Sequence, residues 1–122
     1  MIRALRSYLA ALKASSRLGR AYRLSNKGQK MEAIVVAREG LTILSRPFVK
    51  RQSVAEGSAL ACLTTLVEEL SSELNQPGAS ISDLKDSLKF IKQLPDASSS
   101  EVQNMKSWVP YLETKTRETP RA

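Results

Sequence analysis

The sequence carries few side chains that could perform chemistry. It has no histidine and one cysteine, Cys62, so the usual general base and the Ser–His and Cys–His pairs are absent. Zinc sites of the common Cys/His type are excluded for the same reason. Cys62 stands in the apolar stretch ALACLTTL and is interpreted as a small core residue. We therefore predict no catalytic residue, metal or cofactor, and we expect the chain not to be an enzyme.

Two adjacent acids, Glu68 and Glu69, are the nearest approach to a carboxylate pair. Neighbouring residues on a helix point about 100° apart, so these two carboxylates do not form an obvious metal site. We interpret both as solvated surface charge.

Positive charge is the most informative feature. The first thirty residues contain eight lysines and arginines and no acid. The net charge of +7 is uneven, because residues 1–53 carry +10 and residues 54–122 carry −3. Such asymmetry bears on partners and not on fold. The candidate partner-binding residues are the cations of the first helix: Arg3, Arg6, Lys13, Arg17, Arg20 and Arg23.

Several roles compete for this basic segment. Its amphipathic, arginine-rich and acid-free character is typical of a transit peptide or of a helix on a membrane surface, so residues 1–14 could be a cleaved or membrane-associating piece. The charge also suffices for non-specific nucleic-acid binding, although no helix-turn-helix reader, zinc finger or cluster of stacking aromatics is present. A face that is merely solvated is the simplest alternative, and docking of an acidic protein is the one we favour.

The elements that would position these cations are helical. Ile2, Leu5, Leu9 and Leu12 have the three-four spacing of one helix face, and we expect them to be core, together with Leu18, Gly19 and Tyr22 on a continuation of the apolar stripe. The front segment is either one long helix or two that break near Ser15 and Ser16.

Further helices are expected over 31–44, from about 54 to 75 and from about 80 to 94, with a fifth after Ser98 that Pro110 kinks or ends. The widest apolar stripe belongs to the third, which we place at the centre. Ser53 with Glu56, and Ser98 with Glu101, have the spacing of capping boxes. Gly40 suggests close approach by another helix.

The pattern predicts an all-α, single-domain bundle of five to six antiparallel helices over residues 1–113, followed by a flexible tail over 114–122. No apolar run is long enough to span a bilayer. With a single cysteine there is no internal disulfide, which fits a reducing compartment such as the cytoplasm.

Residues 15–47 resemble the helical hairpin of tetratricopeptide repeats. Leu18 and Gly19 fall where that family has its Leu-Gly pair, Tyr22 on its first-helix aromatic, and Gly40 on its small packing position. No second copy fits the chain at the repeat's period of about 34 residues. The resemblance implies a hairpin near the N-terminus and a scaffold that holds another protein or peptide.

Together these observations favour a non-enzymatic binding protein whose partner is an acidic protein. An adaptor, a chaperone, or an immunity protein that inhibits a cognate toxin are concrete forms of it. The alternative is a non-specific binder of nucleic acid or of an anionic membrane surface.

Overall fold

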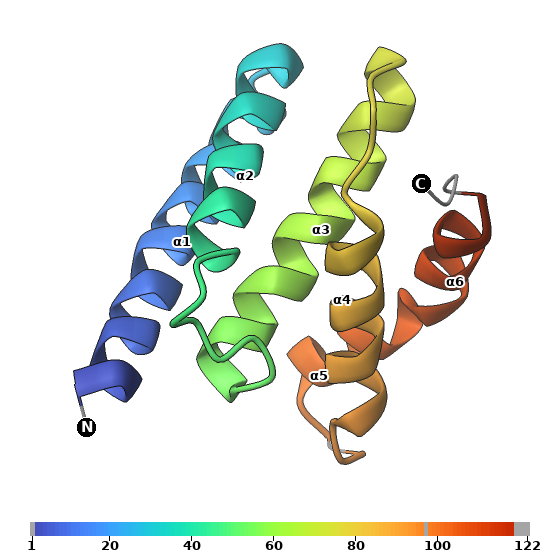
Figure 1. Ribbon diagram of the computed structural model, residues 1–122. Helices are drawn as coiled ribbons and strands as arrows, with labels where there is room; N and C mark the ends of the chain where they lie inside the picture. The colour runs from blue at the N-terminus through green and yellow to red at the C-terminus, as the bar shows by residue number, and fades with distance from the viewer. Residues whose placement is uncertain (1, 97, 119–122) are drawn as a thin grey trace.

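The computed structural model is all-helical, and it describes residues 2–96 and 98–118. Six helices follow one another over that part of the chain: α1 Ile2–Asn26, α2 Lys30–Leu44, α3 Val54–Leu74, α4 Ile81–Gln93, α5 Ser100–Ser107 and α6 Val109–Glu118. The described residues contain no strand. The α1–α2 pair forms one edge, α3 lies in the middle, and α4 to α6 form the other edge (Figure 1). The predicted bundle of five to six helices is confirmed.

The front segment is a single helix, and a tight turn folds α2 back against it. Gly28 adopts a left-handed backbone with φ +81°, and the Gln29 amide donates to the Leu24 carbonyl at 2.9 Å. Gly40 lies where α1, α2 and α3 meet. A Cβ added there would stand 2.8 Å from Cδ1 of Leu63 and 3.4 Å from Cβ of Arg17. The close approach expected at this glycine is therefore confirmed.

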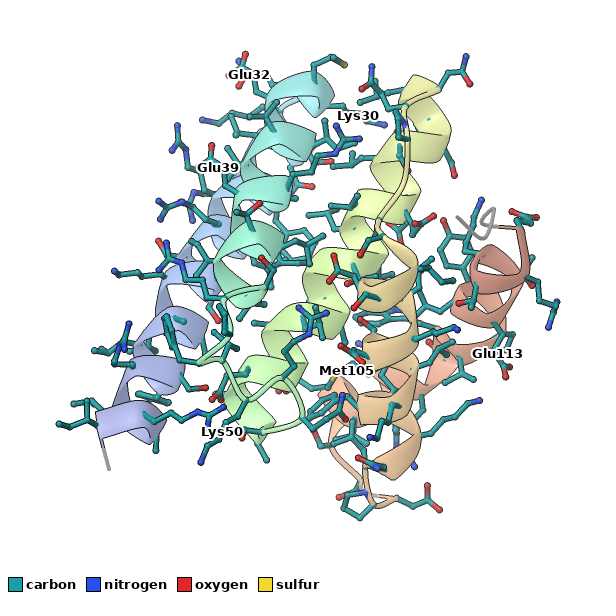
Figure 2. The ribbon with its side chains drawn as sticks, viewed as in Figure 1. Lys30, Glu32, Glu39, Lys50, Met105 and Glu113 are labelled. Carbon is teal, nitrogen blue, oxygen red and sulfur yellow. The ribbon has the colours of Figure 1, made fainter. Side chains whose placement is uncertain are left out.

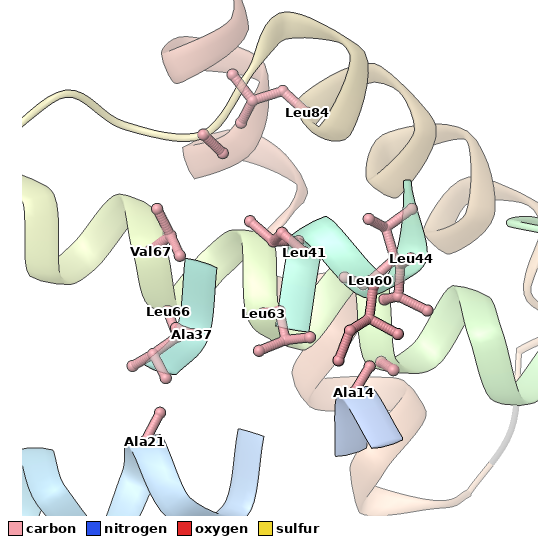
Figure 3. Packing of buried hydrophobic residues seen from close by; sticks show 14 of the residues in the cluster. Ala14, Ala21, Ala37, Leu41, Leu44, Leu60, Leu63, Leu66, Val67 and Leu84 are labelled. Carbon is pink, nitrogen blue, oxygen red and sulfur yellow. The ribbon is translucent and has the colours of Figure 1, made fainter. Parts of the chain in front are cut away.

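The central position of α3 is also confirmed. It packs against α1, α2 and α4, and its aliphatic side chains Leu60, Leu63 and Val67 are fully buried. Figure 3 shows Ala14 and Ala21 of α1 pointing into this cluster. Gly57 lets α4 come close, because a side chain there would overlap the ring of Phe90. The core is mostly aliphatic, with Phe90 as its buried aromatic residue among those described, and small residues let its helices approach closely.

The buried face of α1 differs from the expected one. Ile2, Leu5, Leu9 and Leu12 are exposed, Tyr22 is exposed as well, and Leu18 is half-buried. The buried residues of α1 are small: Ser7, Ala10, Ala11, Ala14 and Ala21. Short side chains on this face allow α1 to lie close to α2 and α3, where leucines would hold the helices apart. The prediction that the leucine stripe is core was therefore wrong.

Two buried carboxylates hold segments of the bundle together. Glu56 does not cap its own helix but accepts a hydrogen bond from Ser7 Oγ, which in turn accepts one from the Lys50 amide at 2.8 Å. Glu68 is buried too, contrary to its interpretation as surface charge, and accepts from the Ala79 amide at 2.7 Å. Buried carboxylates need such donors. Glu56 thereby links α3 to α1, and Glu68 links α3 to the segment before α4.

Neither of the two predicted capping boxes forms. Neither Ser53 nor Ser99, which takes the N-cap position of α5 in place of Ser98, makes a side-chain cap hydrogen bond. Ser80 does cap α4 by accepting from the Asp83 amide at 3.1 Å.

The C-terminal helix continues beyond the expected end of the folded part. The helical conformation is interrupted at Trp108, between α5 and α6. Pro110 lies in the first turn of α6, where a missing amide hydrogen costs little. The boundary expected at 113 falls inside α6, and residues 114–118 are helical. They lack an apolar pattern, but Lys115 donates to Ser72 Oγ at 3.2 Å and lies over the Tyr111 ring. The last part of the expected tail, 119–122, lies outside the described residues.

Candidate protein-interaction surface

The six predicted cations are all carried by α1, and only some of them come together. Arg6 and Lys13 line a groove with Arg46 and Phe48, and Lys13 and Arg17 line its continuation, again with Arg46. We call the surface formed by Arg6, Lys13, Arg17 and Arg46 the basic groove. It runs along the α1–α2 edge, where Figure 2 shows Glu39 among nitrogen-tipped side chains.

Two contacts fix the positions of cations in the basic groove. The Arg6 guanidinium lies over the Phe48 ring, 4.2 Å from its centroid. Arg17 Nε is 3.4 Å from a Glu39 carboxylate oxygen, in an exposed ion pair. Within residues 2–96 and 98–118, no acidic side chain lies in ion-pairing range of Arg6, Lys13 or Arg46 (the ion pairs of that part of the chain involve other residues). Glu39 lines the groove and pairs with Arg17, so the positive charge that no described acid pairs with is that of Arg6, Lys13 and Arg46.

The other predicted cations lie elsewhere on α1. Arg20 borders a separate hollow that is lined by apolar side chains, among them Leu24 and Met31, and by two acids, Glu32 and Glu39. Arg23 lies beside Gly19, and neither Arg3 nor Arg23 lines the basic groove. The six residues thus do not form one patch.

Sequence reasoning missed Arg46 and Phe48. Both belong to the loop that follows α2, in the stretch SRPF, to which the sequence patterns assigned no binding role. The available signal was an arginine and an aromatic residue two positions apart in a loop, since both residue types are enriched at binding surfaces.

An apolar feature borders the basic groove. Leu9 lines the groove and is also one of four exposed large apolar residues, with Ile2, Leu5 and Leu12, on the outer side of α1. Large exposed apolar residues that are contiguous and flanked by polar groups are typical of interaction sites. The groove and this apolar face form one continuous surface.

The environments of Cys62 and Tyr22, the side chains most able to react, do not favour their ionised forms. Burial, reinforced by Glu101, raises the pKa of the Cys62 thiol to about 11, so the nucleophilic thiolate is scarce at neutral pH. Tyr22 is 41% exposed, but desolvation of its covered part, together with Cys62 and Glu69, raises its pKa to about 12. In the part of the chain that the structure describes, no cluster of histidine, cysteine and acidic residues is arranged to hold a metal ion. The absence of enzymatic activity stays a prediction.

Comparison with known proteins gives no relative: no family model, no curated protein and no solved structure matches the chain. The resemblance of residues 15–47 to tetratricopeptide repeats therefore stays a prediction, although α1 and α2 do form a hairpin there. None of the described helices combines the length and apolar character needed to cross a membrane.

Proposed function

We propose that this chain is a non-enzymatic interaction module that binds an acidic protein partner through the basic N-terminal surface. An immunity protein that inhibits a cognate toxin, an adaptor and a chaperone are all forms of such a module. The proposed location is a reducing compartment such as the cytoplasm, in which the free thiol of Cys62 persists.

The observation that supports the proposal is the basic groove. Four cations converge there from α1 and the loop after α2, and they stand beside the apolar side chains of Leu9, Ile43 and Phe48. Arginine and lysine next to apolar surface suit a carboxylate carried on an apolar stem, and arginine adds bidentate geometry. Arg6 is already held in place by Phe48, so less conformational entropy is lost when it binds.

A second candidate is an anionic membrane surface. Exposed Ile2, Leu5, Leu9 and Leu12 beside cations are also what an interfacial amphipathic helix presents. For nucleic acid the structure adds no comparable observation.

The test is affinity capture from the native host with the full chain, with and without nuclease. The variant Lys13→Glu with Arg46→Glu reverses two groove charges that have no ion-pair partner among the described residues. The matched control is Lys85→Glu with Lys89→Glu, two exposed lysines of α4. We expect the groove variant alone to lose an acidic protein that the wild type retains after nuclease treatment.

Three results would contradict the proposal. One is equal capture by the groove variant and its control. The second is capture that nuclease abolishes, which would identify nucleic acid as the partner. The third is the absence of captured protein combined with sedimentation on vesicles that contain phosphatidylserine.

A further inference from the structure

The outer face of α1 carries a heptad pattern that the bundle leaves unused. Ile2, Leu5, Leu9 and Leu12 occupy a, d, a and d positions, and they are 77%, 58%, 46% and 48% exposed. In the same register Ser7, Ala14 and Ala21 are the f positions, and all three are fully buried. In a coiled coil the a and d residues face the partner helix and f faces solvent. In this protein the arrangement is the opposite one. The f residues of α1 pack inside its own bundle, and the a and d residues face solvent.

The two edges of this seam differ in charge. The e positions are Arg6, Lys13 and Arg20, so that edge is uniformly cationic. The g positions are Tyr8, Ser15 and Tyr22, which are uncharged, and both tyrosines are exposed. In coiled coils the e and g residues set the choice of partner through interhelical ion pairs. A partner helix that complements this seam carries carboxylates along the edge that meets Arg6, Lys13 and Arg20.

We propose that the outer face of α1 binds an acidic amphipathic α-helix of the partner protein by short coiled-coil packing. The apolar residues of that helix interdigitate with the a/d seam, and its carboxylates pair with the cationic e edge. Arg6 and Lys13 belong to both the seam's edge and the basic groove, so the helix lies against the surface already assigned to the acidic partner. This inference rests on the proposed function and names the form that the partner takes.

Charge argues against a second copy of the chain as the occupant. No acid is present on α1, so two copies would bring two cationic helices together. An antiparallel pair would place e against e, cation against cation, and a parallel pair would place e against the uncharged g edge. Neither orientation yields an interhelical ion pair.

The width of the apolar stripe argues against a lipid surface. The continuation of the seam is Ser16, Gly19 and Arg23, so the apolar part covers only two heptads. Apart from Tyr8 at one g position, the large exposed apolar residues of these two heptads occupy only a and d positions, which is the narrow geometry of a helix–helix seam.

The experiment uses the full chain and two synthetic three-heptad peptides. The acidic peptide has leucine at a and d, glutamate at e and g, and alanine elsewhere, and the basic peptide has lysine in place of glutamate. Binding is measured by fluorescence anisotropy of the labelled peptides. We expect the acidic peptide to bind and the basic peptide to bind at least tenfold more weakly.

Variants of exposed residues then test the seam itself. Leu5→Ser with Leu9→Ser should weaken binding of the acidic peptide at least tenfold, as should Lys13→Glu with Arg20→Glu. Val54→Ser removes another exposed apolar side chain, on α3, and should leave binding unchanged. All these side chains are exposed, so circular dichroism should show an unchanged helical content.

Four outcomes would overturn the inference. They are equal binding of the two peptides, binding that is insensitive to the Leu5 and Leu9 replacements, a homodimer that those replacements dissociate, and sedimentation on phosphatidylserine vesicles without peptide binding. The inference and the proposed function fail separately. If a captured acidic protein is lost on reversal of Lys13 and Arg46 but kept by the Leu5 and Leu9 variant, the function stands and the helical partner does not.

Discussion

At the scale of single residues, small side chains decide how closely the helices approach. Gly57 on α3 faces the ring of Phe90, and an added methyl group would overlap that ring. Gly19 on α1 has only the end of the Arg23 side chain within contact distance, at 3.5 Å from an added Cβ. The same substitution at the two glycines therefore has opposite physical consequences.

Gly57→Ala should destabilise the protein by about 1–3 kcal/mol, because the core must shift to accept the methyl group. Gly19→Ala should stabilise it by up to about 1 kcal/mol, since alanine favours the helix and nothing rigid opposes it. Urea denaturation followed by circular dichroism measures both free energies of unfolding. An equal effect of the two substitutions would show that Phe90 does not lie on Gly57.

Cys62 gives a prediction on reactivity and pH. Its thiol pKa of about 11 is raised by burial and by Glu101, so at pH 8 only about one thiol in a thousand is ionised. Alkylation by iodoacetamide should be far slower than that of free cysteine, and its rate should keep rising with pH beyond 9. Mass spectrometry of timed samples gives these rates, and the urea-unfolded chain is the control. A rate that levels off near pH 8 would contradict the raised pKa of the Cys62 thiol.

At the scale of elements, an arginine ties the α2–α3 connection to α4. Arg51 Nη2 lies 2.6 Å from Asp83, its Nε lies 2.8 Å from Asp86, and its Nη1 donates to the Leu44 carbonyl at 3.1 Å. Partial burial opposes the charged guanidinium, but the hydrogen bonds to Asp83 and Asp86 outweigh it and raise the pKa of Arg51. The planar fork of arginine is needed for three such bonds at once.

Arg51→Lys should therefore cost about 1–3 kcal/mol although the charge is kept, because a single ammonium cannot reach all three acceptors and leaves some of them unpaired. Arg46→Lys, in the exposed basic groove, is the matched control and should change stability by less than about 0.5 kcal/mol. Thermal unfolding compares the two variants. Equal stability of Arg51→Lys and wild type would contradict the role assigned to this arginine.

The sequence predicts the helices better than the faces they bury. Apolar periodicity, together with Gly28, Pro47 and Pro95, defines where the helices begin and end, and the structure agrees closely. The orientation of α1 could not be predicted because the helix has two apolar stripes, one of leucines and one of alanines. Leucine gains more from burial, but only the alanine stripe allows contact as close as that seen beside Gly40.

The candidate site was predictable only in part, for a related reason. Arg6, Lys13 and Arg17 recur along one helix and are visible in the sequence. Arg46 and Phe48 join them only because α2 folds back and returns the loop after it to the start of α1. Such a juxtaposition depends on tertiary packing, which local sequence patterns do not encode.

At the scale of the whole molecule, charge is divided along the chain: residues 1–53 carry +10 and residues 54–122 carry −3. Opposite charges on a partner speed its diffusional encounter, and salt screens that attraction over a Debye length of about 8 Å at physiological ionic strength. Added salt should therefore act mainly on the association rate.

We expect the association rate of the acidic peptide to fall at least tenfold when salt is raised from low to about 0.5 M, with a much smaller change in the dissociation rate. Stopped-flow fluorescence measures both rates. Association that is independent of salt would contradict electrostatic steering.

The absence of a side chain at Gly40 links the interior to the surface. An added Cβ there would press on Leu63 inside the bundle and on the base of Arg17 at the α1–α2 edge. The lack of a side chain at Gly40 thus lets α1 and α2 lie close together, and the distance between these helices affects the spacing of the cations in the basic groove. If the proposed partner binds in this groove, a substitution at Gly40 would change the spacing of the cations that the partner meets without contacting the partner itself.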